Sequence, residues 1–481
     1  MKSGSVVAID LGGSNGRVIV GHVGPDRLDL EDVHRFPNDP VRLPDGLHWD
    51  ALRLFHEIVE GLRRAGRSAP DLASVAIDSW AVDFGLLDAS GALLYEPFHY
   101  RDGRSASAIE AVHARVPREE LYARTGLQFL PFNTLYQLVA ARQLSAFAAA
   151  RSVLLMPDLF GYWLTGIKAA ERTNASTTGL FDARTGAWAQ DLMKAVGISP
   201  ALFPELRNPG DELGPLAELV ISETGLSAAV PVTLVGSHDT ASAVVGVPAD
   251  GERFAYIACG TWSLVGVELT QPVLTDASRA ANFTNEAGVD GRVRYLRNVM
   301  GLWLLQESLR TWENAGAPEN LADLLAGASR LPDGGPVIDP DDAAFLPPGD
   351  MPRRIEAACR GSDQPVPSSR PALVRCILDS LAAAYGRALA DATRLSGLAV
   401  DTVHVVGGGA RNELLCQLTA DVCGLPVVAG PVEATAIGNV LIQARALGLV
   451  EGDLEALRAR IRSSHPLRRF EPRVLRARSR G

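Results

Sequence analysis

Lysine, cysteine pairs and long apolar runs are all scarce in this 481-residue sequence, and each absence excludes a class of protein. The only lysines are Lys2, Lys168 and Lys194. None follows a glycine-rich loop, so a phosphate site of the Gly-x-x-x-x-Gly-Lys type is absent and any bound phosphate must be held by backbone amides and metal. The five cysteines form no Cys-x-x-Cys pair, and their odd number argues against a disulfide framework.

The N-terminal apolar run, residues 6–9, ends at Asp10 and is too short for a signal-peptide core or a membrane span, so we expect a cytoplasmic protein. The net charge of −10 argues against nucleic acid as a partner, because duplex binding depends on neutralising phosphates. A chain of this length predicts two large domains. No surface pattern in the sequence indicates an oligomer.

Residues 232–242 (VTLVGSHDTAS) predict a buried strand, a tight turn at Gly236 and the start of a helix. The turn would bring Asp239 to the carboxyl edge of a sheet, where ligands of open α/β sheets bind. Flanked by His238 and Thr240, this carboxylate is suited to accept a proton from a bound hydroxyl. Aspartate is also a preferred helix cap, so a purely structural N-cap role fits the segment equally well.

Residues 6–20 predict a strand, a glycine-rich turn and a second strand. Three glycines and Asn15 permit positive φ in this turn, and successive amides in such a turn form a concavity that suits a phosphate. Asp10, at the end of the first strand, is placed to hold a hydrated magnesium ion. An ordinary Asn-Gly hairpin turn is the commoner use of this pattern.

Residues 254–267 repeat the pattern, with Gly260 and Thr261 in the turn. Two such hairpins, one opening each half, suggest a duplicated domain with two phosphate-binding turns, although hairpins are common enough for a chance match. Farther along, a strand at 402–406 ends in three glycines, residues 407–409. Glycines there allow a phosphate or a flat ring to approach the backbone closely.

The remaining segments give an outline of alternating strands and helices. Trp80, beside two carboxylates near a strand end, would suit a sugar, although tryptophan is more often a core residue. We expect a helix at 49–64, strands within 74–87, helical structure at 135–165, a helix after 298–306, a loop at 331–369, a long helix at 372–395 and a solvated, frayed tail at 458–480.

In this order along the chain, Asp10 with its turn, Asp239, Gly260-Thr261 and the three glycines resemble the FGGY carbohydrate kinases of the actin-like superfamily. The resemblance runs from about residue 6 to about residue 443. Within the family it is greatest to the kinases of L-rhamnulose. It is carried by residues 77–84 (IDSWAVDF), 128–138 (QFLPFNTLYQL), 237–243 (SHDTASA), 260–263 (GTWS) and 300–306 (MGLWLLQ).

The resemblance implies an α/β fold of two ribonuclease-H-like domains that flank a deep cleft. We predict a sugar-binding domain at 1–243 and a nucleotide-binding domain at 244–481. The implied reaction transfers the γ-phosphoryl group of ATP to the 1-hydroxyl of L-rhamnulose, with Asp239 as the base. Positioning and charge stabilisation carry most of the catalysis in such a transfer.

The resemblance also implies the other site residues. Asp10 would reach Mg²⁺ through water. The residues implied for ATP are Gly13, Ser14, Asn15, Gly16, Arg17, Thr261, Gln306 and Gly408. Those implied for the ketose are Ala81, His238, Asp239, Thr240 and Asn298.

Two departures from the family pattern bear on the substrate. The family usually has glycine at the position of Ala81, and the added methyl group could narrow the sugar pocket. The first turn has Gly-Gly-Ser-Asn in place of the more usual Gly-Ala-Ser-Ser, which should preserve the amide donors. Two alternatives therefore stay open: a kinase of another ketose such as L-fuculose or xylulose, and a non-catalytic, nucleotide-gated sugar-binding protein.

Overall fold

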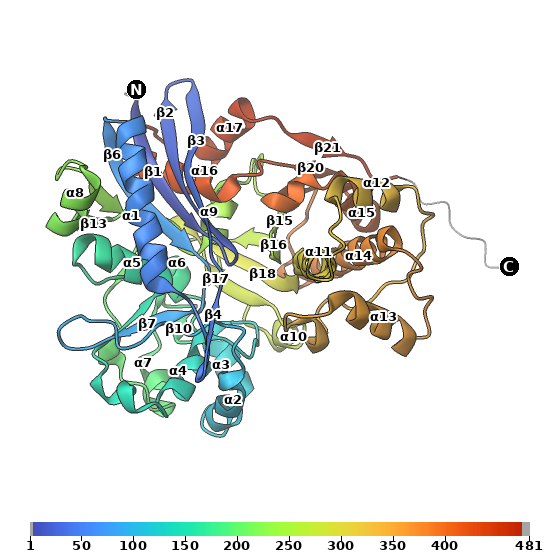
Figure 1. Cartoon of the computed structure of the whole chain (residues 1–481), viewed down its shortest axis with the longest axis horizontal. Coiled ribbons are helices and arrows are strands. Elements are labelled where there is room, and N and C mark those ends of the chain that lie inside the picture. Colours follow the sequence, from blue (N-terminus) through green and yellow to red (C-terminus); the bar gives the residue numbers. More distant parts are fainter. Residues whose placement is uncertain (1–2, 474–481) are drawn as a thin grey trace. The chain divides into compact units, whose positions relative to one another are not determined.

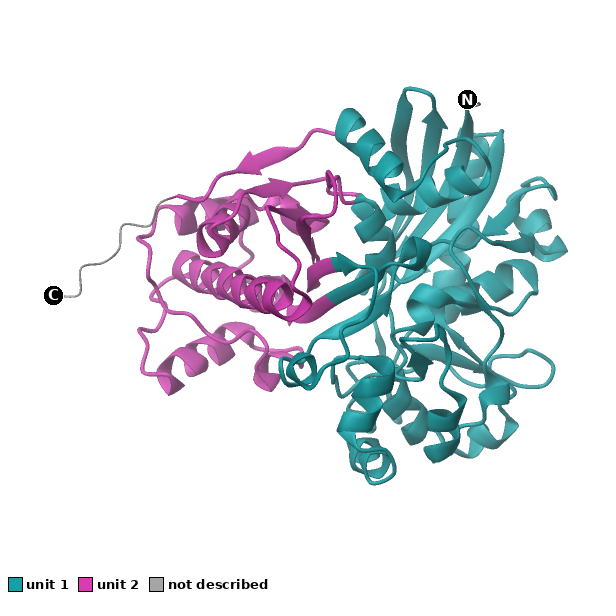
Figure 2. Cartoon of the chain, turned by 180° about the vertical axis from the view of Figure 1, so that it is seen from behind, with its two compact units in different colours: residues 1–246, 268–295, 434–464 teal, residues 247–267, 296–433, 465–481 magenta. Residues whose placement is uncertain are grey.

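In the computed structural model, which describes residues 3–473, the chain forms two compact units. Figure 2 shows each unit in its own colour. Unit 1 comprises Met1–Gly246, Glu268–Tyr295 and Ala434–Ser464, and unit 2 comprises Val247–Val267, Leu296–Glu433 and His465–Gly481. The predicted division at residues 243 and 244 stays a prediction.

Unit 1 is built on a six-stranded sheet with the order β13-β14-β6-β1-β2-β3 (Figure 1). The central strands β1 and β6 are parallel and almost completely buried, which explains their continuous Val, Ala and Ile composition. The opening segment forms the predicted antiparallel hairpin of β1 and β2. The bounds are β1 Gly4–Leu11, β2 Asn15–Gly24, β3 Arg27–Pro37, β6 Leu72–Ser79, β13 Glu212–Pro215 and β14 Pro231–Thr233.

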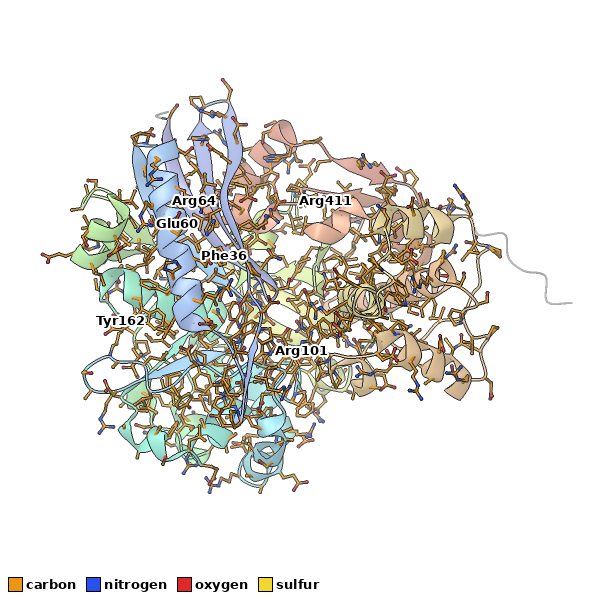
Figure 3. All side chains as sticks on the ribbon, in the orientation of Figure 1. Phe36, Glu60, Arg64, Arg101, Tyr162 and Arg411 are labelled. Carbon is orange, nitrogen blue, oxygen red and sulfur yellow. The ribbon has the colours of Figure 1, made fainter. Side chains whose placement is uncertain are left out.

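The predicted helix at 49–64 is α1, Ala51–Ser68, which packs against β2 and β3. Its buried residues include Leu54, Ile58 and Leu62, spaced four apart, so one face meets the sheet. The Asp50 side chain caps the helix by accepting from the backbone N–H of Arg53. On α1, the Arg64 Nε lies 2.9 Å from Glu60 Oε1 (Figure 3).

The prediction of continuous helix at 135–165 is wrong. The helix α4, Thr134–Ala141, is followed by strand β8, Ser152–Leu155, and only then by α5, Met156–Thr165. Strand β8 pairs with β7, Phe84–Leu87, so its apolar run satisfies its backbone groups in a sheet. Pro157 lies in the first turn of α5, where its missing N–H costs nothing.

The helix that begins at Asp239 is α9, Asp239–Val245, and it packs closely on α16, Ala434–Ala446. Small residues make this contact possible. A Cβ atom on Gly438 would lie 1.9 Å from the carbonyl oxygen of Ser242, so only glycine fits there.

The second large sheet has seven strands in the order β17-β18-β16-β15-β19-β20-β21, and most of its residues belong to unit 2. The second predicted hairpin is present as antiparallel β15 and β16, and β15 runs parallel to β19. The predicted long helix is α14, Arg370–Ser396. The strand bounds are β15 Phe254–Cys259, β16 Trp262–Leu269, β18 Val293–Met300, β19 Thr402–Val406, β20 Val427–Ala429 and β21 Arg468–Phe470.

Two further predictions need correction. The expected loop at 331–369 contains the helix α13, Met351–Gly361, which is capped by the Asp350 side chain and buries Met351, Ile355 and Cys359 along one face. The expected frayed tail begins inside α17, Leu454–Ser464, where Arg458 and Ile461 are buried. Residues 474–480 of that prediction lie outside the described part of the chain.

The other elements are shorter or serve mainly to complete the packing. In the range 3–473, no helix is both long and apolar enough to cross a membrane. The remaining helices are α2 Ala106–His113, α3 Arg118–Thr125, α6 Arg172–Ala175, α7 Gln190–Ala195, α8 Glu218–Thr224, α10 Asp276–Ala280, α11 Trp303–Asn314, α12 Leu321–Ser329 and α15 Glu413–Cys423. The remaining strands are β4 Val41–Leu43, β5 Gly46–His48, β9 Ala170–Glu171, β10 Phe181–Asp182, β11 Ala187–Trp188, β12 Leu206–Arg207 and β17 Thr284–Ala287.

Candidate active site

The turn between β1 and β2 carries five of the predicted nucleotide residues. It is closed by a hydrogen bond from the Gly12 N–H to the Asn15 carbonyl (2.9 Å), and the Asn38 amide donates to the Gly12 carbonyl (2.8 Å). Ser14 and Asn15 are exposed. Their exposure leaves the turn accessible to an anion on its outer side.

Glycine is needed in this turn for a reason other than the expected positive φ. Neither Asn15 nor the glycines of the turn are among the residues with positive φ. Instead, a Cβ atom on Gly16 would lie 2.2 Å from the ring of Phe36 on β3, which is labelled in Figure 3. Gly16 is therefore required by close packing of the hairpin against β3.

Besides burial, the negative charges of Asp10 and Asp239 both raise the pKa of Asp78, and Asp10 and Asp78 lie near the carboxyl ends of the neighbouring strands β1 and β6. Asp10 of β1 pairs in register with Asp78 of β6, and Arg17 makes an ion pair with Asp10. Asp78 accepts from the Asn439 amide (2.6 Å), while its other oxygen is buried without a hydrogen-bond partner. Burial and the charge of Asp10 raise the pKa of Asp78 well above its ordinary value.

Asp239 is the first residue of α9, and the N-cap position belongs to His238, whose side chain makes no cap hydrogen bond. The N-cap role considered for Asp239 is therefore not what the structure shows. Its side chain is 31% exposed. Burial raises the pKa of Asp239 above its ordinary value, His238 opposes the change and the charge of Asp10 adds to it, so the carboxylate is a better base than a free aspartate.

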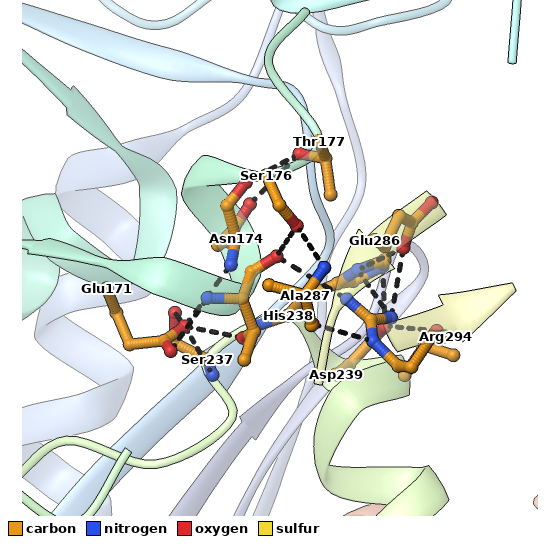
Figure 4. Close-up of polar contacts among 12 residues, drawn as sticks. Glu171, Asn174, Ser176, Thr177, Ser237, His238, Asp239, Glu286, Ala287 and Arg294 are labelled. Carbon is orange, nitrogen blue, oxygen red and sulfur yellow. Dashed lines mark hydrogen bonds and ion pairs between the residues drawn. The ribbon is translucent and has the colours of Figure 1, made fainter. Parts of the chain in front are cut away.

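The loop that delivers Asp239 is held from behind by buried polar groups (Figure 4). The Ser79 N–H donates to the Ser237 carbonyl (2.8 Å), which ties the loop to the end of β6. The Ser237 hydroxyl and N–H both donate to the buried carboxylate of Glu171, at 2.7 and 3.0 Å. These contacts fix the loop independently of any ligand.

Ala81 lies in a loop whose backbone is strained. The next residue, Val82, has a φ of 70°, a conformation that β-branched residues rarely adopt. The Thr134 hydroxyl donates to the Val82 carbonyl (2.7 Å), and so helps to hold it. Strain of this kind persists only where the surroundings impose it, and it gathers at ligand-binding sites.

In unit 2 the predicted nucleotide residues lie on two turns, which carry Thr261 and Gly408, and on helix α11, which carries Gln306. The Thr261 hydroxyl lies 3.4 Å from the Gln306 side-chain oxygen, so these two are together. Gly408 follows β19 and is exposed, and a Cβ atom there would meet nothing within 4 Å. Its neighbour Gly409 packs on Cys259, where a Cβ atom would lie 2.2 Å from Sγ. Asn298 lies on β18 and is half-buried.

The predicted residues thus form two groups. The first, in unit 1, is Asp10, residues 13–17, Ala81 and residues 238–240. The second, in unit 2, is Thr261, Asn298, Gln306 and Gly408. That the two groups act on one pair of substrates stays a prediction.

The oxygen donors near Asp10 fit a magnesium ion. Carboxylates are the ligands that Mg²⁺ prefers, and the partnerless oxygen of Asp78 lies buried near the same strand end. Among the described residues, no group of three His, Cys, Asp or Glu side chains could hold a metal by itself. Mg²⁺ usually keeps several waters and is bound through one or two carboxylates and the phosphates of a substrate.

Sequence reasoning missed several residues around this site. Glu286 and Arg294 contact His238 from strands β17 and β18, and Asn439 reaches Asp78 from α16. For Arg294 the available signal was a charged residue between the apolar residues Val293 and Tyr295, whereas Glu286 lies in a polar segment that gives no such signal.

Comparison with solved structures defines the class as a two-domain sugar kinase fold. The chain is similar to gluconate kinase from Lactobacillus acidophilus (TM-score 0.80, 16% identity, covering 98% of this chain and 94% of the other). It is also similar to the ligand-bound xylulose kinase of that organism (TM-score 0.79, 16% identity, the same coverage).

The family follows from sequence models. Residues 5–246 match the N-terminal domain, and residues 255–447 the C-terminal domain, of the FGGY family of carbohydrate kinases. The chain belongs to this family. Among its relatives, the rhamnulokinase of Bacteroides thetaiotaomicron is 43% identical over 98% of this chain and 96% of its own. The rhamnulokinase of Enterococcus faecalis is 41% identical over 96% and 92%.

Proposed function

We propose that the protein is an ATP-dependent kinase of L-rhamnulose that forms L-rhamnulose 1-phosphate and ADP. The observation that carries the proposal is identity of about 40% to rhamnulokinases along nearly the whole of both chains. The fold, shared at 16% identity with gluconate and xylulose kinases, does not select the substrate by itself. A cytoplasmic location follows from the use of ATP.

In the proposed reaction the 1-hydroxyl oxygen of the ketose attacks the γ-phosphorus of ATP. The bond from that phosphorus to the β–γ bridging oxygen breaks, ADP leaves, and the hydroxyl proton passes to Asp239. The raised pKa of Asp239 favours this role, because a base whose pKa is closer to neutrality accepts the proton more readily.

The other groups position the substrates. The backbone amides of residues 13–16, of which Ser14 and Asn15 are exposed, and the hydroxyl of Thr261 would hold phosphate oxygens, with Gln306 and Gly408 facing the nucleotide. Asp10 would hold Mg²⁺ through water, and the ion when bound offsets phosphate charge. His238, Thr240, Ala81 and Asn298 would contact the ketose.

The first test of function is an ADP-release assay with ATP, Mg²⁺ and a panel of ketoses. Preference for L-rhamnulose over L-fuculose, L-xylulose and D-xylulose is expected. Preference for another ketose would make the protein a kinase of that sugar, and would indicate that the methyl group of Ala81 reshapes the pocket. Absence of turnover with every sugar would favour a nucleotide-gated binding protein.

We expect Asp239→Asn to lower kcat at least about 10³-fold while leaving the binding of ketose and ATP nearly unchanged, because an amide cannot accept the proton. A matched control is Asp276→Asn, which alters the first residue of another helix, α10, at an exposed position. Near-normal turnover in Asp239→Asn would refute the assignment of the base.

Asp10→Ala should raise the Mg²⁺ concentration required for half-maximal turnover, because the carboxylate that holds the hydrated ion is lost. The measurement is a magnesium titration of the steady-state rate at saturating ATP and ketose. Asp211→Ala, at a loop position of unit 1, serves as the control. An unchanged titration curve for Asp10→Ala would contradict its role.

A further inference from the structure

A buried ion pair lies directly behind His238 (Figure 4). Arg294 Nη1 lies 3.0 Å from Glu286 Oε2, and the side chains are 0% and 4% exposed. Arg294 also donates from Nε to the carbonyl of Ala287 (3.0 Å). Because removing two charges from water is costly, a pair at this depth is weak evidence for added stability. Its position beside the proposed ketose site points to another role.

Both members of the pair approach the same nitrogen of His238. Nδ1 lies 3.1 Å from Arg294 Nη1, in a hydrogen bond, and 3.2 Å from Glu286 Oε2. Of these two contacts only the one with Arg294 has hydrogen-bond geometry, since Glu286 Oε2 is a buried oxygen without a hydrogen-bond partner. A guanidinium has donors only, so Nδ1 is the acceptor in the bond with Arg294. A neutral imidazole that accepts at Nδ1 carries its proton on Nε2. This Nε2 lies 3.5 Å from Asp239 Oδ1.

Glu286 supplies the charge that balances the guanidinium. Burial raises the pKa of Glu286, the charge of Arg294 lowers it, and the net pKa lies below its ordinary value. The side chain is therefore a carboxylate at neutral pH. Without it, Arg294 would be a buried cation with no opposite charge among its contacts.

We propose that Arg294 and Glu286 are positioning residues that hold His238 as the Nε2–H tautomer and present that proton to the ketose. This inference rests on the proposed function, in which His238 binds the sugar beside Asp239. A fixed donor at Nε2 can hydrogen-bond a sugar oxygen and so restrain the hydroxyl from which Asp239 takes its proton. Arg294 sets the tautomer, and Glu286 neutralises Arg294.

The kinetic test replaces the pair as a unit, because removing one partner would strand a buried charge. In the double variant Glu286→Leu/Arg294→Met we expect the KM for the ketose to rise about tenfold or more, with the KM for ATP within about twofold of the wild type. The matched control is Glu268→Leu/Arg458→Met, which removes another buried ion pair of unit 1 (Nη1 to Oε2, 2.9 Å). It should leave the KM for the ketose unchanged.

The direct test is the tautomer itself, read from long-range ¹H–¹⁵N spectra of substrate-free protein labelled at histidine. The spectrum of His238→Gln identifies the His238 signals. The wild type should show the Nε2–H form, the double variant should lose that preference, and the control variant should keep it. A wild-type ring protonated at Nδ1 would overturn the proposal, and this result requires no variant to fold.

The two measurements separate this inference from the proposed function. The spectra contain no substrate, so failure of the ketose assay would not alter the tautomer result. Conversely, if the ketose assay succeeds while the double variant keeps both the tautomer and the ketose KM, the pair has no positioning role. A uniform loss of ATP and ketose binding in the double variant would also contradict the proposal, because it would indicate a merely structural role.

Discussion

Asp83 is a completely buried carboxylate beneath the Ala81 loop. It accepts hydrogen bonds from Trp49 Nε1 (2.6 Å), Trp80 Nε1 (3.2 Å), the Tyr100 N–H (3.1 Å) and Gln137 Nε2 (2.7 Å). Trp80 is close to Asp83 in the sequence, but the other three donors come from distant segments, so this one carboxylate holds several segments together around the loop. Burial outweighs the donors and raises the pKa of Asp83 to about 6.

This shift predicts a pH-dependent stability. Because the folded-state pKa lies above the unfolded value of about 3.8, the folded protein binds more protons between those pH values, and this contribution falls as pH rises from about 4 to about 6. The advantage of the wild type over Asp83→Asn should shrink by about 3 kcal/mol across this window. Thermal unfolding of both proteins from pH 4 to pH 7 measures it, and a constant difference in Tm would contradict the assigned shift.

At the residue scale, some site positions could be read from the sequence and others could not. Asp239 and Gly408 lie directly after strands or at helix starts, where local pattern places a residue at a sheet edge. Arg294 alternates with apolar neighbours in its strand and therefore resembles an outward-facing residue. Its burial depends on Glu286 and His238, which meet it only through tertiary folding.

At the scale of elements, the two hairpin turns differ in what their glycines do. A Cβ atom on Gly16 would lie 2.2 Å from the Phe36 ring, whereas one on Gly260 would meet only the Trp262 carbonyl oxygen at 3.7 Å. The similar sequence patterns of the turns hide this difference. The sequence pattern locates both turns. That Gly16 cannot be replaced follows only from the packing of Phe36, on the third strand β3, against the hairpin.

Gly16→Ala should therefore destabilise the protein by about 1–3 kcal/mol through overpacking, whereas Gly260→Ala should be nearly neutral. The measurement is the Tm of each variant without ligands. The double variant Gly16→Ala/Phe36→Leu, which makes room for the methyl group, should recover part of the loss relative to Phe36→Leu. An equal Tm for Gly16→Ala and the wild type would show that the Phe36 ring can move aside without loss of stability, which would contradict the prediction.

The two elements that the sequence does not predict, β8 and α13, have different causes. The run Val153 to Leu155 is apolar and short, and such a run fits a strand or a buried helix equally well until its partner strand is known. Helix α13 has the signals of a cap at Asp350 and three apolar residues at four-residue spacing, but proline and glycine on both sides obscure them. A long helix such as α14 is predictable, because its apolar residues repeat with helical spacing over many turns.

At the scale of the whole molecule, the chain passes from one unit to the other after residues 246, 267, 295, 433 and 464. The proposed phosphoryl transfer requires the reacting atoms of ketose and ATP to be about 3–3.5 Å apart, and the residues predicted to bind these substrates are divided between the two units. A closure that brings the units together on their substrates would also exclude water from the transferred group.

We therefore expect the radius of gyration in solution scattering to decrease when ketose and a non-hydrolysable ATP analogue are both saturating. The value should approach the roughly 23 Å that the general size relation gives for one compact chain of this length. Asp239→Asn should compact equally, since it keeps its ligands and lacks only the base, and a sugar that supports no turnover should produce no change. If the wild type keeps the same radius with both ligands bound, the units do not close, and the alignment of ketose and ATP must already exist in the free protein.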